Sequence, residues 1–482
     1  MNVKQAEISL PNPMAVLFVV IYLRKFHISE EDGTMANVAP NSVSTRRERV
    51  AWYLYDFGNS AYASVVLLAV YSAYFQKQVV GGAEGSRIWG LTISIAMIIV
   101  AIAAPIMGAI ADYSGAKKRF LFFFTALSVV FTAMLFFTQK GTVMLAIVCF
   151  LLAEIGYRAA QVFYDALLPE IASPGEMGRV AGTGWAIGSA GGIAILLLIL
   201  PPILMTKSDL LVVRGSLIAT AVFFAAAAAP IFLRLTERAK PQQLPPGENY
   251  FSVAFKQLGE TIKAARGFNE FLKFMLAYLV YNEGVIIALD FAAILGAVLF
   301  GLEQTGLIIF FILVQATNVL GALLFGNLQD RFGGKPSLSI SIMLMVACIA
   351  ALYFAQNQTH FFIIGGFVGV AMAGVQSVSR AMVATFSPPG KSAEFFGFFA
   401  LTGRTSSFIG PAVFGWLAAE LTLWYQAQGQ DLALAEQSGH RLAILSIAAF
   451  LIAGWALMLM VNEKKALETV GQMTVEDTTA SK

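Results

Sequence analysis

Residues 326–335 read GNLQDRFGGK and close a long apolar run, and residues 108–119, which read GAIADYSGAKKR, close another 218 positions earlier. A second pair of features has nearly the same spacing. Arg158 and Arg380, 222 positions apart, each lie in an apolar run that ends in a loop containing proline and glycine. Such self-similarity indicates two copies of one structural unit. In so apolar a chain, it predicts a membrane protein made of two parallel six-helix repeats, an architecture typical of secondary transporters.

Composition supports a membrane protein and argues against several other classes. Of the 482 residues, 58% are hydrophobic and 13% charged, whereas a soluble domain carries about 25% charged residues. The net charge of +3 gives no electrostatic argument for a nucleic-acid partner. Cys149 and Cys348 lie inside apolar runs, and the three histidines are scattered, so neither a disulfide framework nor a metal site is predicted. We expect no cofactor and no enzyme activity, because no nucleophile, phosphate-binding or metal motif is present.

The apolar segments predict an all-α membrane protein with twelve transmembrane helices. Each is about 20 residues long, the length needed to cross a bilayer. They fall at residues 50–76, 87–111, 119–138, 142–166, 180–203, 214–234, 270–298, 303–328, 337–356, 360–386, 394–420 and 441–461. This order predicts two pseudo-symmetric six-helix bundles, 50–234 and 269–461, followed by a tail, 462–482.

A polar linker, residues 235–268, separates the two predicted bundles. It contains Phe251, Phe255, Leu258 and Ile262 at helical spacing, which predicts an amphipathic helix at the membrane surface. Lysine and arginine are enriched in the linker and in the loops on its side of the membrane, which predicts that this side and both termini are cytoplasmic. The cell membrane of a bacterium, its inner or plasma membrane, is the expected location.

The first 49 residues form a polar segment with one apolar stretch that is too short to span a bilayer. Met35 opens a region rich in Asn, Ser and Pro. We therefore expect that translation begins at Met35 and that the upstream residues reflect a misplaced start.

Polar side chains within the spans mark the expected binding site, because such residues need a partner or a wet cavity. In the first half, Asp56 and Asn59 share a helix face, and Glu154, Arg158 and Gln161 form one stripe. In the second half, Glu283 lies about midway along its span, next to Gly284, where we expect a break in the helix. The remaining candidates for contact with a solute or a proton are Asn282, Asp290, Gln315, Asn318, Gln376, Arg380 and Arg404.

These charges have alternative interpretations that the sequence leaves open. The arginines are suited to gripping a carboxylate or phosphate, or they neutralise Glu283 and Asp290. The polar stripe with Glu154 is either a solute site or an internal salt-bridge relay. Asp56 is either a gate or proton site, or a cap near the membrane edge.

Several motifs together resemble the major facilitator superfamily. They are YDFGNSAY at 55–62, YDALLPEI at 164–171, YNEG at 281–284, QSVSR at 376–380 and the stretch 394–411. Within that superfamily the chain resembles the unknown major facilitator family, which includes fungal vacuolar amino-acid effluxers. The resemblance implies that the repeated loops form a cytoplasmic gate. Its expected residues are Gly108, Asp112, Gly115, Gly326, Asp330, Arg331 and Gly333. Tyr113 departs from the superfamily pattern, in which arginine follows the aspartate.

From these features we expect a monomeric secondary active transporter that moves a small organic solute by alternating access, with protons as a candidate coupling ion. The resemblance favours an amino acid or similar zwitterion and favours export. One alternative is an uptake permease for a muropeptide-like or sugar-containing solute. An alternative of another class is a membrane sensor that binds a solute without transporting it.

Overall fold

The computed structural model describes residues 44–172, 177–238, 249, 252–253, 256, 268–387, 395, 398–399, 402–403 and 407–468. The chain separates into two units, Met1–Val43 and Ser44–Lys482, and all described residues belong to the second. The proposed start at Met35, the four apolar residues of the predicted linker helix, Arg404 and the tail from residue 469 lie outside the described residues.

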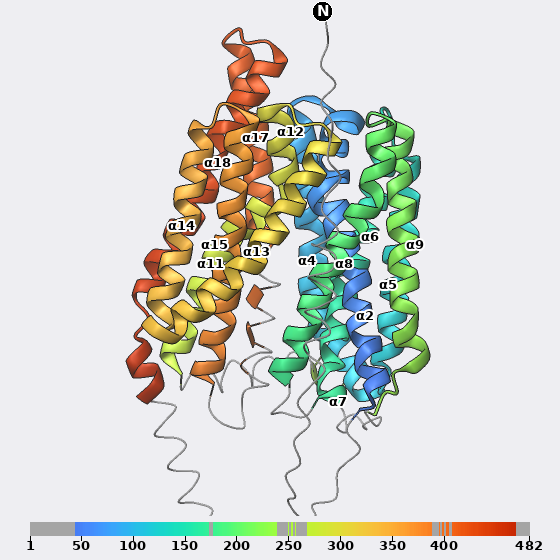
Figure 1. Cartoon of the computed structure of the whole chain (residues 1–482), viewed down its shortest axis with the longest axis vertical. Helices are drawn as coiled ribbons and strands as arrows, with labels where there is room; N and C mark the ends of the chain where they lie inside the picture. The colour runs from blue at the N-terminus through green and yellow to red at the C-terminus, as the bar shows by residue number, and fades with distance from the viewer. Residues whose placement is uncertain are drawn as a thin grey trace, which may run out of the picture. The chain divides into compact units, whose positions relative to one another are not determined.

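The first half contains six long helical elements (Figure 1). They are a span from Arg46 to Val80, made of α2 (Arg46–Tyr62), η1 (Ala63–Ala69), α3 (Tyr71–Tyr74) and η2 (Phe75–Val80), then α4 (Gly82–Ser114), α5 (Lys117–Met134) with η3 (Leu135–Phe137), α6 (Val143–Ala166), α8 (Met177–Met205) and α9 (Leu210–Arg234). The short helix α7 (Leu168–Ile171) follows α6.

The second half repeats this order. Its helices are α11 (Asn269–Asp290) continued by α12 (Ala292–Phe300), α13 (Gln304–Phe332), α14 (Gly334–Phe354), α15 (Gln358–Phe386), α17 (Ile409–Ala427) and α18 (Leu432–Leu459). Eleven helices in the described part are long and apolar enough to cross a membrane. The 19-residue helix α17 occupies the position of the remaining predicted span, and the predicted twelve-helix, all-α architecture is confirmed.

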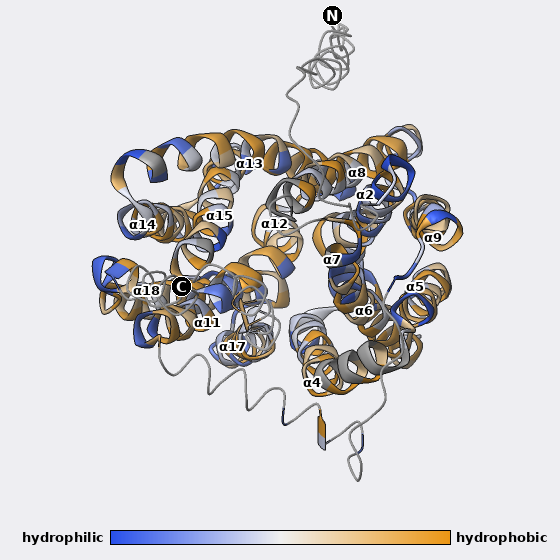
Figure 2. Ribbon diagram, turned by 90° about the horizontal axis from the view of Figure 1, so that it is seen from below, coloured by the Kyte–Doolittle hydropathy of each residue, from blue (hydrophilic) through white to orange (hydrophobic). Residues whose placement is uncertain are grey.

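Helix packing follows the same scheme in both halves. In the first half α5 packs on α6 and α9, and α2 packs on α9; in the second half α14 packs on α15 and α18, and α11 packs on α18. Two further pairs, α4 with α17 and α8 with α13, join the halves. Figure 2 shows the helices of each half gathered into their own group. The repeated pairings are the structural counterpart of the repeated sequence.

The helix ends fall into two sets, called the linker end and the far end. The linker end is where α2, α5, α8, α11 and α14 begin, and the far end is where α4, α6, α9, α13 and α18 begin. At the far end, the first span widens into π-helical turns over η1 and η2, a distortion that often accompanies functional regions.

The expected break at Gly284 is wrong, because α11 continues through this residue to Asp290. A Cβ at Gly284 would lie 2.8 Å from Leu451 Cγ and 3.0 Å from the Ile447 carbonyl oxygen. The glycine therefore allows α18 to approach α11 closely. The helix axis is interrupted later, at Phe291, between α11 and α12.

Candidate functional site

A buried cluster on α2 and α6 contains the charged pair that the sequence predicts. Arg158 Nε donates to Glu154 Oε1 at 2.7 Å, and the Tyr62 hydroxyl donates to Glu154 Oε2 at 2.9 Å. The Glu154 side chain is fully buried, while that of Arg158 is 21% exposed. Tyr157 stacks on Tyr62 and lies under the guanidinium. Glu154 thus fixes one edge of the guanidinium, and no further hydrogen bond from it is found among the described residues.

Asp290 of the second half faces this cluster. It is an electrostatic neighbour of both Arg158 and Glu154 and is 3% exposed. Its Oδ2 atom has no hydrogen-bond partner among the described residues, although burying a charged group without a partner is costly. The two halves therefore present a guanidinium and a carboxylate to each other, and both retain unused hydrogen-bonding capacity.

A second group of candidate residues lies nearer the linker end. Arg380 of α15 stacks over the Trp185 ring of α8, with 4.6 Å between the guanidinium carbon and the ring centroid. Arg380 is also an electrostatic neighbour of Asp56. A Cβ at Gly188 would lie 2.5 Å from Asp56 Oδ2, so this glycine makes room for the carboxylate. The contact between Trp185 and Arg380 joins the halves across the linker-end side of the site.

The Glu283 carboxylate is already hydrogen-bonded to the backbone, whereas a group that binds a solute or a proton is expected to have free oxygens. Its Oε2 accepts from Gly410 N at 2.7 Å, and its Oε1 accepts from Ile409 N at 3.3 Å. These are the first residues of α17. A carboxylate at a helix N-terminus satisfies free N–H groups and complements the helix dipole. Glu283 therefore caps α17, and its proposed role in proton coupling stays a prediction.

The other candidates lie on α2, α6, α11, α13 and α15. Asn59 is buried beside Asp56, and Gln161 Nε2 donates to the Tyr157 hydroxyl at 3.2 Å. Asn318 Nδ2 donates to the Gly369 carbonyl oxygen at 3.4 Å. The remaining candidates with described side chains, all buried or half-buried, are Asn282, Gln315 and Gln376.

The halves meet tightly at the far end. Among the described residues, every hydrogen bond that we find between the halves lies there. The bonds join Trp89 Nε1 to the Asp290 carbonyl (3.1 Å), Gln304 Nε2 to the Ala69 carbonyl (2.6 Å), Ser86 Oγ to His440 Nε2 (2.6 Å), Arg87 Nη2 to Glu420 Oε1 (2.6 Å) and Lys77 Nζ to the Ala297 carbonyl. The structure is therefore a state in which the far end is closed.

Glycines on α4 and α17 permit this closure. A Cβ at Gly415 would lie 2.5 Å from the Ser86 carbonyl oxygen, and a Cβ at Gly90 would collide with the Pro411 carbonyl. Any larger residue at either position would force the helices apart.

The repeated loops have a role that the sequence did not reveal. The Glu237 carboxylate accepts from Lys117 N (2.7 Å) and Lys118 N (3.2 Å), the first residues of α5. In the second half, Glu463 accepts from Gly334 N (2.9 Å) and Lys335 N (3.0 Å), the first residues of α14. Burial raises the pKa of the Glu237 carboxyl, against the effect of its two N–H donors. Each cap joins two elements of the same half, the first cap in the first half and the second cap in the second half.

The lysines of the two loops complete the same arrangement. Lys118 Nζ donates to the Leu235 carbonyl at 2.6 Å, and Lys335 Nζ donates to the Val461 carbonyl at 2.7 Å. Each loop is thus fastened to the chain that leaves the last helix of its own bundle.

The predicted gate residues are only partly described. Gly115 and Gly333 adopt positive φ angles of 59° and 87° at the ends of α4 and α13, and Arg331 is exposed. Gly108 and Gly326 lie within α4 and α13, and a Cβ at Gly326 would meet open space. The side chains of Asp112 and Asp330 lie outside the described residues. Their role as gate latches stays a prediction.

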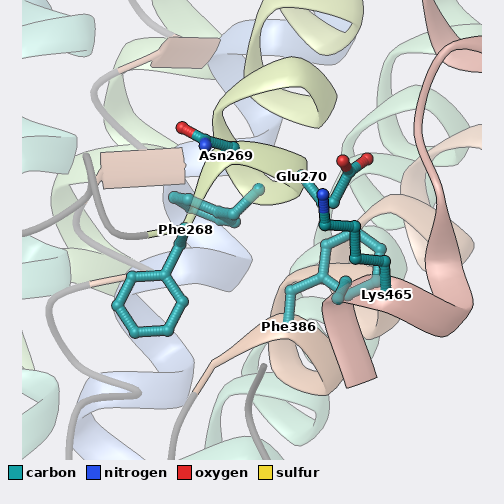
Figure 3. A pocket seen from close by; sticks show the side chains of 7 residues that line it. Phe268, Asn269, Glu270, Phe386 and Lys465 are labelled. Carbon is teal, nitrogen blue, oxygen red and sulfur yellow. The ribbon is translucent and has the colours of Figure 1, made fainter. Parts of the chain in front are cut away.

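A small pocket of about 60 Å³ lies at the linker end of α11. Figure 3 shows the side chains of Glu270 and Lys465 extending toward each other beside Phe386. Glu270 also accepts from Asn462 N at 2.7 Å and from Lys273 Nζ at 2.9 Å. This volume holds a few water molecules, so the pocket is too small for an organic solute.

Sequence reasoning missed several residues of these sites. His440 was one of three scattered histidines, and its partner Ser86 lies 354 positions away. Glu237 and Glu463 were detectable in principle, because both follow the last helix of a repeat and lie 226 positions apart. Trp185 gave no signal beyond a run of small residues.

Comparison with known proteins identifies relatives along most of the chain. A family model described as "Vacuole effluxer Atg22 like" matches residues 86–471. A Bacillus subtilis protein described as the uncharacterized MFS-type transporter YxiO is 31% identical over 389 residues, covering 78% of this chain and 89% of that protein. Autophagy-related protein 22 of Coccidioides immitis is 24% identical over 182 residues, which span 30% of its length.

Solved structures agree on the fold. A bacterial homologue of the human lysosomal transporter Spinster, in an inward-facing and unoccupied conformation, has a TM-score of 0.64 at 14% identity and covers 88% of this chain and 99% of its own. A mutant form of the nucleoside transporter NupG also has a TM-score of 0.64, at 13% identity, with coverage of 86% and 99%. The Bacillus subtilis relative and both structural neighbours are described as transporters, not as enzymes. The predicted major facilitator fold is confirmed, and the protein is a multi-pass membrane transporter of this type.

Proposed function

Because the chain belongs to the family described as vacuole effluxer Atg22 like, we propose that it transports an amino acid or a similar zwitterion by alternating access, in the direction of export. The family description supports export. The loop charges support a cytoplasmic linker end in a bacterial cell membrane. We propose that the protein works as a monomer.

The observation that carries the proposal is the electrostatic interaction of Arg158 with Asp290 across the two halves. A guanidinium whose Nε edge is fixed by Glu154 can offer its other nitrogens to a carboxylate in a two-bond fork. Asp290 Oδ2, buried without a partner among the described residues, can accept from an ammonium group. The positive and negative ends of one zwitterion would therefore satisfy both groups at once.

The contacts between the two halves indicate from which side the solute would reach the site. With the far end closed by hydrogen bonds between halves, the solute would reach the site from the linker end, where Trp185 and Arg380 meet. Arg380 then has two partners, the Trp185 ring and the Asp56 carboxylate. Exchange between these partners would open and close this side of the site.

Counterflow in liposomes tests the proposal. Purified full-length protein is reconstituted, the vesicles are loaded with unlabelled amino acids one at a time, and entry of the labelled form is followed. We expect labelled solute to accumulate transiently for at least one amino acid. Binding without counterflow would instead assign a sensor, and counterflow confined to sugar-containing peptides would assign the uptake permease.

Proton coupling has its own test. We propose that Asp290 carries the coupling proton when no ammonium occupies it. An imposed pH gradient should then drive accumulation by the wild type, whereas Asp290→Asn should lose accumulation and keep exchange at a raised KM, because the amide oxygen can still accept from the ammonium but carries no charge. Accumulation that ignores the pH gradient in the wild type would remove the proton from the mechanism.

A further inference from the structure

An apolar groove of about 430 Å³ runs along the outer surface of the first half, between α5 and α9. Nine apolar side chains line it, namely Val129, Val130, Ala133, Met134, Phe137, Ile218, Ala221, Val222 and Ala225. On each helix these residues recur at spacings that form a single stripe. Alanines contribute from both helices, so the groove forms where two helices present small side chains between larger ones.

This groove lies on a surface that faces lipid. The span containing α5 has the lowest buried share of the described spans, 28%. Val130 and Val222 are 53% and 63% exposed. From Val129 to Phe137 the stripe extends roughly 12 Å at 1.5 Å per residue, which is close to half of a hydrocarbon core about 30 Å thick. The groove therefore has the depth of one leaflet.

A cationic group closes the far end of the groove. Arg214 lies one helical turn before Ile218 on the same stripe of α9. Its Nη1 donates to the Phe136 carbonyl at 3.5 Å and to Gln139 Oε1 at 3.4 Å, and its guanidinium lies 5.4 Å from the Phe136 ring centroid. These partners are uncharged, as is the Leu210 carbonyl oxygen, to which Arg214 Nε donates at 3.4 Å.

The charge at this mouth is not neutralised locally. No ion pair with Arg214 is found in the part of the chain that the structure describes. The exposed Lys140 follows Gln139 in the same loop, and the carboxylate of Asp209 is used to cap α9 through Leu211 N at 2.8 Å. An apolar groove one leaflet deep thus ends at a guanidinium, and the adjoining loop carries a second basic residue, Lys140.

We propose that this groove binds an anionic phospholipid of the bilayer, with one acyl chain between α5 and α9 and the phosphate at Arg214 and Lys140. Guanidinium groups grip phosphate oxygens in two-bond geometry. The lipid would join α5 to α9 at the far end, as the Glu237 cap joins the two helices at the linker end.

Native mass spectrometry of the purified full-length protein, titrated with phosphatidylglycerol or phosphatidylcholine of matched chains, tests the site. We expect the wild type to retain more phosphatidylglycerol. Arg214→Gln should reduce that preference about fivefold, the contribution of one basic residue at a lipid surface. Val222→Trp, which fills the groove, should reduce retention of both lipids.

Two controls separate binding from folding. Ile363→Trp places the same ring at a lipid-facing position of α15 that is 56% exposed and should leave retention unchanged. Arg214→Lys keeps the charge and should keep most of the preference. Equal retention of both lipids by the wild type, or a loss in Arg214→Lys as large as in Arg214→Gln, would overturn the proposal. A dimer that Val222→Trp dissociates would assign the groove to a second copy of the chain.

Discussion

Arg158 is the residue on which the proposed solute chemistry depends. Its guanidinium has a planar fork, so it can keep Glu154 on one edge and bind a carboxylate on another, whereas lysine offers a point charge. We expect Arg158→Lys to raise the KM for counterflow at least about tenfold, which corresponds to loss of one charge-assisted hydrogen bond. Arg234→Lys, on the exposed end of α9, is the matched control and should leave the KM unchanged. An unaltered KM in Arg158→Lys would remove this residue from the site.

Substitution of Glu283 tests whether this carboxylate stabilises the start of α17 or takes part in proton coupling. Because its two oxygens accept from Ile409 N and Gly410 N, Glu283→Gln keeps the shape but leaves one N–H of α17 without an acceptor. We expect a loss of about 1–3 kcal/mol in the free energy of unfolding, measured by thermal unfolding in detergent. Unchanged stability with abolished proton-driven accumulation would return Glu283 to a coupling role.

At the residue scale, the sequence predicted interactions within one helix better than interactions between helices. The spacing of Glu154 and Arg158 predicted an ion pair, and the pair is present at 2.7 Å. The capping role of Glu283 was not predictable, since its partners lie 126 and 127 positions away. Their arrangement depends on where α17 begins, and apolar composition does not determine that boundary.

At the scale of helices, the two carboxylate caps fasten α5 to the end of α9 and α14 to the end of α18. Glu463→Gln should weaken the two bonds to the first N–H groups of α14, at a cost of about 1 kcal/mol for a helix cap. Hydrogen–deuterium exchange should then accelerate at residues 334–337. Glu303→Gln is a matched control, because Glu303 occupies the N-cap position of α13 without a side-chain capping bond. Equal exchange at residues 334–337 in both variants would contradict the proposed role of the cap.

The glycines between α4 and α17 offer a second test at this scale. Gly415→Ala places a Cβ 2.5 Å from the Ser86 carbonyl, and such overpacking costs about 1–3 kcal/mol. The substitution destabilises the state in which the far end is closed. Counterflow should therefore fall severalfold or more, while the helical content is retained. Gly215→Ala meets no atom within 4 Å and should transport normally. Equal rates in the two variants would show that closure tolerates a wider helix spacing.

Helix existence was predictable from the sequence, whereas helix boundaries and interruptions were not. Eleven predicted spans coincide with apolar helices of spanning length. The last helix, α18, begins at Leu432 rather than near residue 441, because polar residues such as Gln437 and His440 obscured the apolar pattern. The interruption expected at Gly284 occurs at Phe291 instead. Gly284 allows close packing of α11 against α18 and does not mark a flexible point in the helix.

At the scale of the whole molecule, duplication in the sequence predicted duplication in the fold, and each packing pair of the first half has a counterpart in the second. The contacts between halves were not predictable, since they pair residues as far apart as Ser86 and His440. The asymmetric charges, Arg158 in one half and Asp290 in the other, are what place the proposed site between the halves.

Paired distance measurements test most directly whether the halves move against each other around that site. Spin labels at positions 140 and 428 report on the far end, and labels at 119 and 331 report on the linker end, in a background in which the buried Cys149 and Cys348 are replaced by alanine. As transported solute is added, the population with a long far-end distance should grow together with the population with a short linker-end distance. Far-end and linker-end distances that stay constant under conditions of active counterflow would contradict alternating access in this protein.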